Sequence, residues 1–452
     1  MPDHNQSMDK FINDNLDRYI AELTRLCAQP SVSARSEGVR ECAPIVAEIL
    51  RAHGFQVQSF DTPGNPILVG TARGKSAKTM LCYNHYDVQP PEPLELWTTP
   101  PYQPTLRDGA LYARGVKDDK GEFISRLAAV DAVRAANDGE LPVGVTFVVE
   151  GEEEIGSPHI AQFVREHKEL LKSDGAIWEE GGINARGEPV NSLGKRGILS
   201  VEFATQTLTR DAHSGNGSVL PNAAWRLLWA LASLKDRDEK ILIPGFYDAA
   251  KPPSASDEKL LARKPYDEAA TRKEFGVKEF LRGATGDAYQ RAVFQPTCNI
   301  QGIGSGYQGA GGKTIVPAKA IAKVDFRLVP DQDPDDILKK LRAHLDREGF
   351  GDVQVKWLGA MWPAKVSGEH PLVELYARTA REVYGKESIL IPMTGGSSPV
   401  YAFAGPLNIP VINPGLGYDG SRTHAPDENI RLSDFVNASR HVARILDGFA
   451  GI

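Results

Sequence analysis

The segment TMLCYNHYD, residues 79–87, joins a short apolar run to a histidine and an aspartate. The run at 79–83 is apolar on both faces, which is typical of a buried parallel strand. Ligands of open α/β sheets bind at the carboxyl ends of the strands, so His85 and Asp87 are predicted to lie at the edge that forms sites. Taken alone, this pair is more typical of a capped strand end with a hydrogen-bonded histidine than of a metal site.

Three further runs on either side of this segment, 66–69, 144–149 and 175–178, have the same brief apolar character. In the segments between the later runs, apolar residues recur with the spacing of an amphipathic helix. Alternating strands and helices predict an α/β fold with a mixed, mainly parallel sheet flanked by helices. Amphipathic helices are predicted at residues 8–27, 39–53, 121–136, 158–171 and 371–384.

The pattern changes at Gly197, where 198–206 and later 315–328 alternate like strands with one exposed face. Residues 221–234 between them have helical periodicity. These features predict a smaller α+β domain at 197–365, inserted into a larger domain formed by 1–196 and 366–452. Within the insert, residues 244–292 are predicted to be irregular and partly helical.

Composition excludes several classes of protein. The chain has 452 residues and a net charge of −7, with both signs interspersed, which is poorly suited to binding nucleic acid. No apolar run reaches the roughly 18 residues that a membrane helix needs. The N-terminal residues 1–19 lack the features of a secretory signal. The cysteines are widely spaced and favour a reducing cytoplasm over a disulfide framework; they are Cys27, Cys42, Cys82 and Cys298.

Carboxylates follow the strands beyond the first histidine. The run at 144–149 leads into EGEEE, residues 150–154, and the run at 175–178 leads into Glu179 and Glu180. Each cluster alone could be a solvated loop. Like charges crowded at the ends of neighbouring buried strands repel one another, and a bound cation would relieve that repulsion. The sequence therefore predicts a cation site at this edge.

Asp118 and Asp119 stand directly before the predicted helix at 121–136. Aspartates in this position commonly stabilise the positive end of the helix dipole, so capping is the simplest interpretation of the pair taken alone.

Eight stretches in this order resemble the co-catalytic metallopeptidases, a family that includes carnosinase-type dipeptidases, aminoacylases, acetylornithine deacetylases, succinyl-diaminopimelate desuccinylases and glutamate carboxypeptidases. The resemblance is closest to the dipeptidase branch, and together the stretches span most of the chain. They are NHYDVQP (84–90), ARGVKDDKG (113–121), EGEEEIGS (150–157), DAHSG (211–215), KTIVPAKA (313–320), FRLVP (326–330), GGSSP (395–399) and THAPDE (423–428).

The resemblance implies two divalent metal ions per subunit. Zinc is favoured, and Mn²⁺ or Co²⁺ would also suit nitrogen and oxygen ligands. Asp118 would bridge both ions. His85 and a glutamate of the pair Glu179 and Glu180, with Glu179 favoured, would complete one ion. Glu154 and His424 would complete the other.

The resemblance assigns Glu153 as the general base of a metal-bridging hydroxide, which would attack the amide carbonyl. Asp87 would lie behind His85 and set its tautomer and basicity. Asp119 would cap the following helix.

The resemblance implies that 1–196 and 366–452 form the catalytic domain and that the insert at 197–365 is a lid or dimerisation domain. The remaining assignments fall in this insert and near its end. By resemblance, His213 reaches the active site of a second subunit and stabilises the oxyanion, with Asn299 assisting, so the enzyme would be a homodimer. Arg327 would bind the carboxylate of the substrate through its guanidinium fork, together with Gly396 and Ser397.

These residues predict a cytoplasmic metallopeptidase that cleaves dipeptides or small peptides with a free C-terminus, and that binds neither nucleic acid nor membrane. An N-acyl amino acid amidohydrolase is the alternative, because the same chemistry cleaves a similar amide. A non-catalytic binding protein is a remote third possibility. No histidine lies in 355–363, where some carnosinase-type relatives carry one, which argues against histidine-containing dipeptides.

Overall fold

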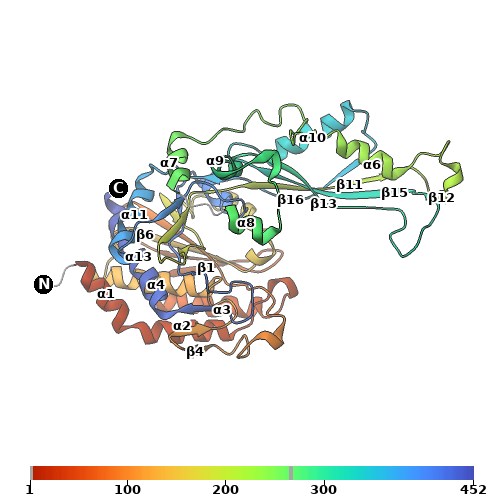
Figure 1. Ribbon diagram of the computed structural model, residues 1–452. Coiled ribbons are helices and arrows are strands. Elements are labelled where there is room, and N and C mark those ends of the chain that lie inside the picture. Colours follow the sequence, from red (N-terminus) through yellow and green to blue (C-terminus); the bar gives the residue numbers. More distant parts are fainter. Residues whose placement is uncertain (1–3, 264–267) are drawn as a thin grey trace. The chain divides into compact units, whose positions relative to one another are not determined.

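The computed structural model describes residues 4–263 and 268–452, and the chain forms two compact units. The first unit comprises Met1–Leu193, Val366–Pro392 and Ala402–Ile452, and the second comprises Gly194–Lys365 and Met393–Tyr401. The short segment Met393–Tyr401, which contains the GGSSP stretch, thus groups with the second unit and not with the catalytic domain to which the sequence analysis assigned it. Figure 1 labels the elements of both units.

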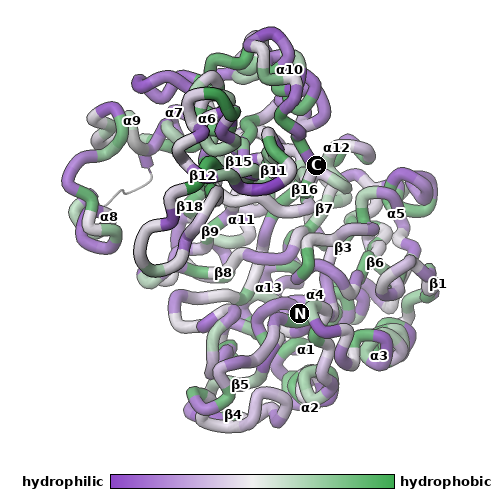
Figure 2. The backbone as a smooth tube through the Cα atoms, turned by 90° about the vertical axis from the view of Figure 1, so that its right-hand side faces the viewer, coloured by the Kyte–Doolittle hydropathy of each residue, from purple (hydrophilic) through white to green (hydrophobic). Residues whose placement is uncertain are grey.

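A six-stranded mixed sheet with the order β1-β2-β6-β3-β7-β19 lies at the centre of the first unit. The pairs β6–β3, β3–β7 and β7–β19 are parallel, and β1–β2 and β2–β6 are antiparallel. Figure 2 shows β7, β3, β6 and β1 following one another across this sheet. The strands are β1 (Gln56–Phe60), β2 (Ile67–Ala72), β3 (Thr79–His85), β6 (Gly144–Glu150), β7 (Gly175–Ile177) and β19 (Val411–Ile412).

The α/β class and the predominantly parallel centre of the sheet are confirmed, but the sequence analysis was wrong about β2. It expected a parallel strand there, whereas β2 pairs antiparallel with β6. The first four residues of β2 are buried, so the sequence pattern is the same whether the strand pairs parallel or antiparallel. Strand β1 was not predicted, because the polar residues of its sequence, QVQSF, obscure the alternation that is typical of a strand.

Helix α4 (Lys120–Ala136) is buried along most of its length and packs against β3 and the neighbouring helices α1, α2 and α13. The predicted helix at 8–27 is two helices, α1 (His4–Asp14) and α2 (Leu16–Ala28), which meet at Asn15. The Asn15 amide donates to the Phe11 carbonyl, a local bond that competes with a regular helix.

Helix α5 (Ile160–Glu166) is shorter than the predicted helix at 158–171. It ends where His167 takes a non-helical conformation and its ring packs against Phe60 and Phe163. The remaining helices and strands of this unit are α3 (Val39–Ala52), α11 (Pro371–Tyr384), α12 (Tyr401–Leu407), α13 (Leu432–Gly448), β4 (Thr105–Arg107), β5 (Ala110–Tyr112), β8 (Gly182–Ile183), β9 (Pro189–Ser192), β18 (Ile389–Ile391) and β20 (Asn429–Arg431).

The second unit is built on an antiparallel sheet with the order β13-β15-β11-β16. Every second residue of β11 is buried against the core, as the alternating sequence predicts. Helices α6 and α10 cover one face of the sheet (Figure 1). The elements are β11 (Gly197–Gln206), β13 (Thr297–Ser305), β15 (Lys319–Leu328), β16 (Gln354–Met361), α6 (Ala223–Ala232), α10 (Pro334–Arg347), β10 (Gly194–Lys195), β12 (Ala212–His213) and β17 (Ala364–Lys365).

The predicted strand at 315–328 is interrupted. Residues Ile315–Val316 form β14, which pairs with β12, and β15 begins only at Lys319. Pro317 lies between them and has no backbone N–H to donate to a ladder.

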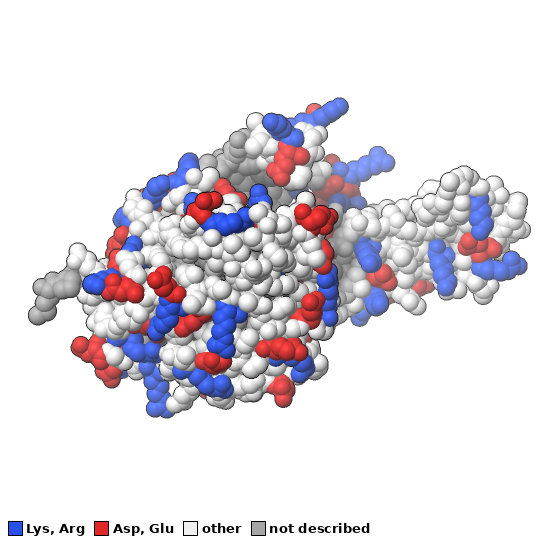
Figure 3. Space-filling view, turned by 90° about the horizontal axis from the view of Figure 1, so that it is seen from below, with Lys and Arg blue, Asp and Glu red and all other residues white. Residues whose placement is uncertain are grey.

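The stretch 244–292 is partly helical, with α7 (Ala255–Arg263), α8 (Glu268–Phe275) and α9 (Gly286–Arg291). Residues 264–267 of this stretch lie outside the described residues. Within the part of the chain that the structure describes, no helix has the length and apolar character needed to cross a membrane. On the face seen in Figure 3, lysine and arginine alternate with acidic side chains, as the composition predicts.

Candidate metal centre

The carboxylate of Asp118 lies between two histidines. Its Oδ1 is 3.1 Å from His85 Nε2, and its Oδ2 is 3.0 Å from His424 Nε2. His85 is the last residue of β3, Asp118 precedes α4, and His424 lies in the loop before β20. The fold thus brings together three residues that are separated by up to 339 positions between 85 and 424.

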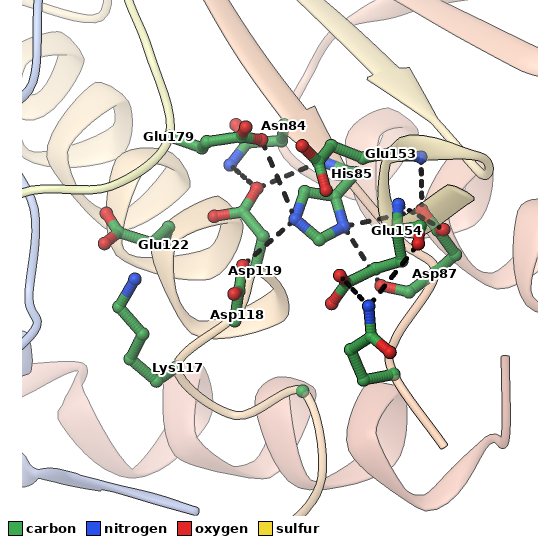
Figure 4. A network of polar contacts seen from close by, with 12 residues as sticks. Asn84, His85, Asp87, Lys117, Asp118, Asp119, Glu122, Glu153, Glu154 and Glu179 are labelled. Carbon is green, nitrogen blue, oxygen red and sulfur yellow. Dashed lines mark hydrogen bonds and ion pairs between the residues drawn. The ribbon is translucent and has the colours of Figure 1, made fainter. Parts of the chain in front are cut away.

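Two groups of possible ligand atoms adjoin this carboxylate. The first is His85, Asp119 and Glu179, and the second is Asp118, Glu154 and His424; within each group the ligand atoms lie within 4.8 Å of one another. Glu179 Oε2 is 3.7 Å from His85 Nε2, and Glu154 Oε1 is 3.3 Å from His424 Nε2. Figure 4 shows the carboxylates of this network converging around His85.

Glu179 lies in the cluster and is only 4% exposed. The next residue, Glu180, has a left-handed backbone with φ 78° and is not part of either group of ligand atoms.

Asp119 differs from the expectation. It occupies the N-cap position of α4, but its side chain makes no capping hydrogen bond. Instead, its Oδ2 accepts hydrogen bonds from the Asn84 amide at 2.7 Å and the His85 backbone N–H at 3.0 Å. The carboxylate therefore holds the end of β3, and Asp119 also belongs to the first group of possible ligand residues.

Asp87 contacts both His85 and the loop that carries Glu153 and Glu154, which we call the glutamate loop. Its two carboxylate oxygens accept the backbone N–H groups of Glu153 and Glu154, at 3.1 and 3.0 Å. His85 Nδ1 lies 3.0 Å from the Asp87 carbonyl oxygen and 3.4 Å from its Oδ1. Asp87 is fully buried. Its contacts link His85, at the end of β3, to the glutamate loop that follows β6.

Burial and mutual repulsion dominate the electrostatics of Glu153 and Glu179. Burial, followed by the charges of Glu154 and Asp118, raises the pKa of Glu153 to about 7, although His85 opposes the shift. Burial and the neighbouring Glu153 also raise the pKa of Glu179 well above its usual range. Ionisation of these groups is therefore unfavourable until positive charge is supplied.

The arrangement accommodates divalent cations. Buried polar atoms normally have partners, yet Asp119 Oδ1, Glu154 Oε1 and Glu179 Oε2 accept no hydrogen bond from the described residues. Carboxylate oxygens and imidazole nitrogens are ligands for Zn²⁺ and related ions. The three residues that carry these oxygens belong to the two groups, so the residues present match two adjacent metal positions.

Glu428 is a further residue of this centre. The sequence assigned it no role of its own, although it is part of the stretch THAPDE. Its buried carboxylate accepts the backbone N–H groups of Gly115, Lys117 and Asp118 at 2.9 to 3.1 Å and the Arg114 guanidinium at 2.6 Å. It therefore ties the loop that carries His424 to the loop that carries Asp118. No pattern in the sequence distinguishes it from a surface acid.

In the second unit, the Arg327 Nη1 donates to Ser397 Oγ at 2.8 Å, and the Arg196 backbone N–H donates to the Gly396 carbonyl at 3.0 Å. Arg196 is 8% exposed, and burial together with the positive charge of Arg327 lowers its pKa to about 10, with Asp325 opposing. Sequence reasoning missed Arg196, because only the fold places it beside Arg327.

His213 and Asn299 both belong to the second unit. His213 is exposed on β12, and its Nδ1 accepts the backbone N–H of Gly215 at 3.0 Å. Asn299, on β13, donates to Asp325 Oδ2 at 3.0 Å.

A family model described as peptidase family M20/M25/M40 matches residues 81–448, which include the whole candidate metal centre. The chain belongs to this family. It is therefore a metallopeptidase, as the motifs predicted, and the mixed α/β fold agrees with that of the family's solved structures.

Individual members of the M20 family align over nearly the whole chain. A structure of the M20 family metallo-carboxypeptidase Sso-CP2 from Sulfolobus solfataricus has a TM-score of 0.86 and 33% sequence identity, covering 96% of this chain and 99% of that one. Beta-Ala-His dipeptidase of Rattus norvegicus is 27% identical over 97% of this chain and 95% of its own length. Cys-Gly metallodipeptidase dug1 of Schizosaccharomyces pombe is 27% identical over 95% of this chain and 96% of its own length.

Proposed function

We propose that this enzyme hydrolyses the peptide bond of dipeptides or small peptides with a free C-terminal carboxylate. The observation that carries the proposal is the position of Asp118, whose two carboxylate oxygens each face one histidine, next to two further carboxylates. This is the arrangement that a bridging ligand between two metal ions requires.

In the proposed centre, His85 and Glu179 hold one divalent ion, Glu154 and His424 hold the second, and Asp118 bridges the two. Zinc is the proposed metal, with Mn²⁺ and Co²⁺ as alternatives. Such a pair would lower the pKa of a bound water and polarise the scissile carbonyl. Asp119 and Asp87 fix the backbone and tautomer of His85 through the hydrogen bonds described above.

Glu153 is the proposed general base. Its carboxylate stands beside His85 in Figure 4, and its backbone is held by the Asp87 carboxylate. It would take a proton from the attacking water and pass it to the leaving nitrogen. Glu153 is expected to carry the transferred proton, because the neighbouring carboxylates would coordinate the metal ions.

The second unit carries the proposed carboxylate site. Arg327 presents a planar guanidinium beside Ser397, and the buried Arg196 adds a second positive charge. Two neighbouring cations and a hydroxyl are suited to an anionic group of the substrate. The relatives named dipeptidase or carboxypeptidase support a substrate with a free C-terminus.

We further propose a cytoplasmic homodimer in which His213 completes the site of the second subunit, with Asn299 assisting. The exposed position of His213 leaves its Nε2 available to a partner. The four cysteines are buried free thiols, which is consistent with a reducing compartment.

A substrate panel tests the proposal. It contains unmodified dipeptides including Cys-Gly and β-Ala-His, their C-terminal amides and N-acetyl amino acids, assayed with metal analysis of the protein. We expect cleavage of the free dipeptides and little cleavage of the amides. Cleavage of N-acetyl amino acids without cleavage of any dipeptide would identify an amidohydrolase instead.

The variant Arg327→Lys sharpens this test, since lysine keeps the charge but loses the fork. We expect kcat/KM for free dipeptides to fall by about 10- to 100-fold, from a lost charged hydrogen bond of roughly 1.5–3 kcal/mol, with the amides unchanged. Arg342→Lys, on α10, is the matched control. An equal loss for amides and free dipeptides would contradict the carboxylate role.

A further inference from the structure

We infer that the first unit carries a second binding site, for a small organic phosphate, at the opposite end of the sheet from the metal centre. The site is a cavity of about 700 Å³ between the start of β6, the start of β3 and the end of β2. This volume falls within the ~300–1,000 Å³ typical of small-molecule sites.

The lining of this cavity is cationic. Arg73, Arg134 and Lys172 line it, and none of the described acidic residues does, although Asp174 accepts the backbone N–H of the lining residue Thr79. Arg73 and Lys172 form no ion pair with any residue in 4–263 or 268–452, and both are exposed to solvent. Arg134 donates to the His53 carbonyl at 2.9 Å and lies 3.6 Å from Asp131, so its charge is partly balanced. The cavity therefore favours a ligand with at least two negative charges.

A row of polar side chains supplies neutral hydrogen-bonding groups in the same cavity. Gln56, Thr71 and Thr146 occupy matching positions on β1, β2 and β6, so their side chains lie on the same face of the sheet. All three line the cavity. Thr146 is only 5% exposed, and its hydroxyl has no hydrogen-bond partner among the described residues.

The Thr146 hydroxyl, which lines the cavity without a partner in the described part of the chain, is therefore open to a hydrogen bond with a ligand there. Three polar groups in register on a sheet that is otherwise mostly apolar therefore have the character of a built site. Guanidinium groups and hydroxyls together recognise phosphate oxygens, with arginine offering a planar fork. The size of the cavity leaves room for an organic group beyond a single phosphate.

This site is separate from the metal centre. Strand β6 begins at Gly144 in the cavity and ends at Glu150 beside the glutamate loop, a rise of roughly 20 Å at ~3.3 Å per residue. A ligand in the cavity therefore makes no contact with a peptide at the metals, and the inference does not depend on the proposed function.

Isothermal titration calorimetry with fructose 1,6-bisphosphate at constant ionic strength tests the inference, since this probe carries two phosphates on a small organic group. We expect saturable binding that Arg73→Gln/Lys172→Gln weakens by at least about tenfold. Thr146→Val, which removes only this hydroxyl, should weaken it by about threefold or more. Peptidase turnover should stay unchanged in all of these variants.

The double variant Arg378→Gln/Arg381→Gln is the matched control, because it removes two exposed positive charges from α11, away from the cavity. It should bind as the parent protein does. Absence of saturable binding, equal binding by the Arg73 and Lys172 variant, or equal affinity for inorganic phosphate and sulfate would each overturn the assignment.

Discussion

Glu153 illustrates how neighbouring residues of one type acquire different roles. Glu152 has its carboxylate 2.5 Å from the His159 Nδ1, whereas Glu153 and Glu154 turn toward the metal centre. The turn η3 (Glu153–Ile155) and the two hydrogen bonds from their backbones to Asp87 produce this separation. Adjacent identical side chains in the sequence thus face different surroundings.

The first prediction concerns Glu153→Gln. The amide retains the shape but cannot accept a proton, so kcat should fall by about 10²- to 10⁴-fold, the usual contribution of general acid–base catalysis. Metal content, measured by inductively coupled plasma mass spectrometry, should not change. Glu152→Gln is the matched control and should retain turnover. Near-normal activity of Glu153→Gln would exclude this side chain as the base.

At the scale of elements, one buried carboxylate connects two loops of the metal centre. Glu428 precedes β20, is fully buried and accepts the backbone of the segment that leads into α4. It also pairs with Arg114, which is itself 1% exposed. Removing one partner of such a pair leaves an uncompensated buried charge.

We therefore predict that Glu428→Gln lowers both stability and metal affinity. Loss of the buried charge should destabilise the fold by about 3–5 kcal/mol. Disorder of the Asp118 loop should weaken metal binding by about 10- to 100-fold, as for other residues that orient ligands. Thermal denaturation and metal titration measure the two effects. Glu92→Gln, in an exposed pair with Arg35, should change stability by less than about 1 kcal/mol.

Three helices are joined by a second buried group, His53, at the end of α3. Its Nδ1 is 2.8 Å from Asp131 on α4, and its Nε2 is 2.9 Å from Glu22 on α2. Burial lowers the pKa of His53, but the hydrogen bonds to Asp131 and Glu22 outweigh burial and raise it to about 9. The protonated imidazolium is therefore favoured in the folded protein.

A pH dependence of stability follows from this raised pKa. The stabilisation by His53 is fully present below its unfolded pKa of about 6.5 and is lost as the pH rises through about 9. It amounts to at most about 3–4 kcal/mol, from ~1.4 kcal/mol per unit of pKa. Urea denaturation of the parent and His53→Gln between pH 6 and 10 should show a difference that shrinks with rising pH. A difference independent of pH would contradict the charged state.

At the scale of the whole molecule, the proposed site depends on a second subunit. If His213 acts across a dimer, Glu153→Gln and His213→Ala chains should complement each other. A mixed dimer has one site with both defects and one with neither, so an equal mixture should regain about a quarter of the parent activity. Activity after subunit exchange, monitored by native mass spectrometry, measures this. No recovery despite exchange would contradict the proposed role of His213.

The sequence by itself determined the family, the α/β class and the order of the motifs, because buried strands and their polar ends are encoded locally. It also predicted most helices closely, such as α11 at Pro371–Tyr384, from periodicity alone. Local pattern could not determine strand direction, as β2 shows, nor the break between α1 and α2 at Asn15.

Only the tertiary structure decided which carboxylates meet. Asp119 binds the end of β3 instead of capping its helix, Glu428 secures the Asp118 loop, and Arg196 lies beside Arg327. The same holds for the polar row of Gln56, Thr71 and Thr146, which exists only through strand register. The physical reason is that hydrogen bonds, burial and charge pairing act through space, between residues that the chain brings together only when it folds.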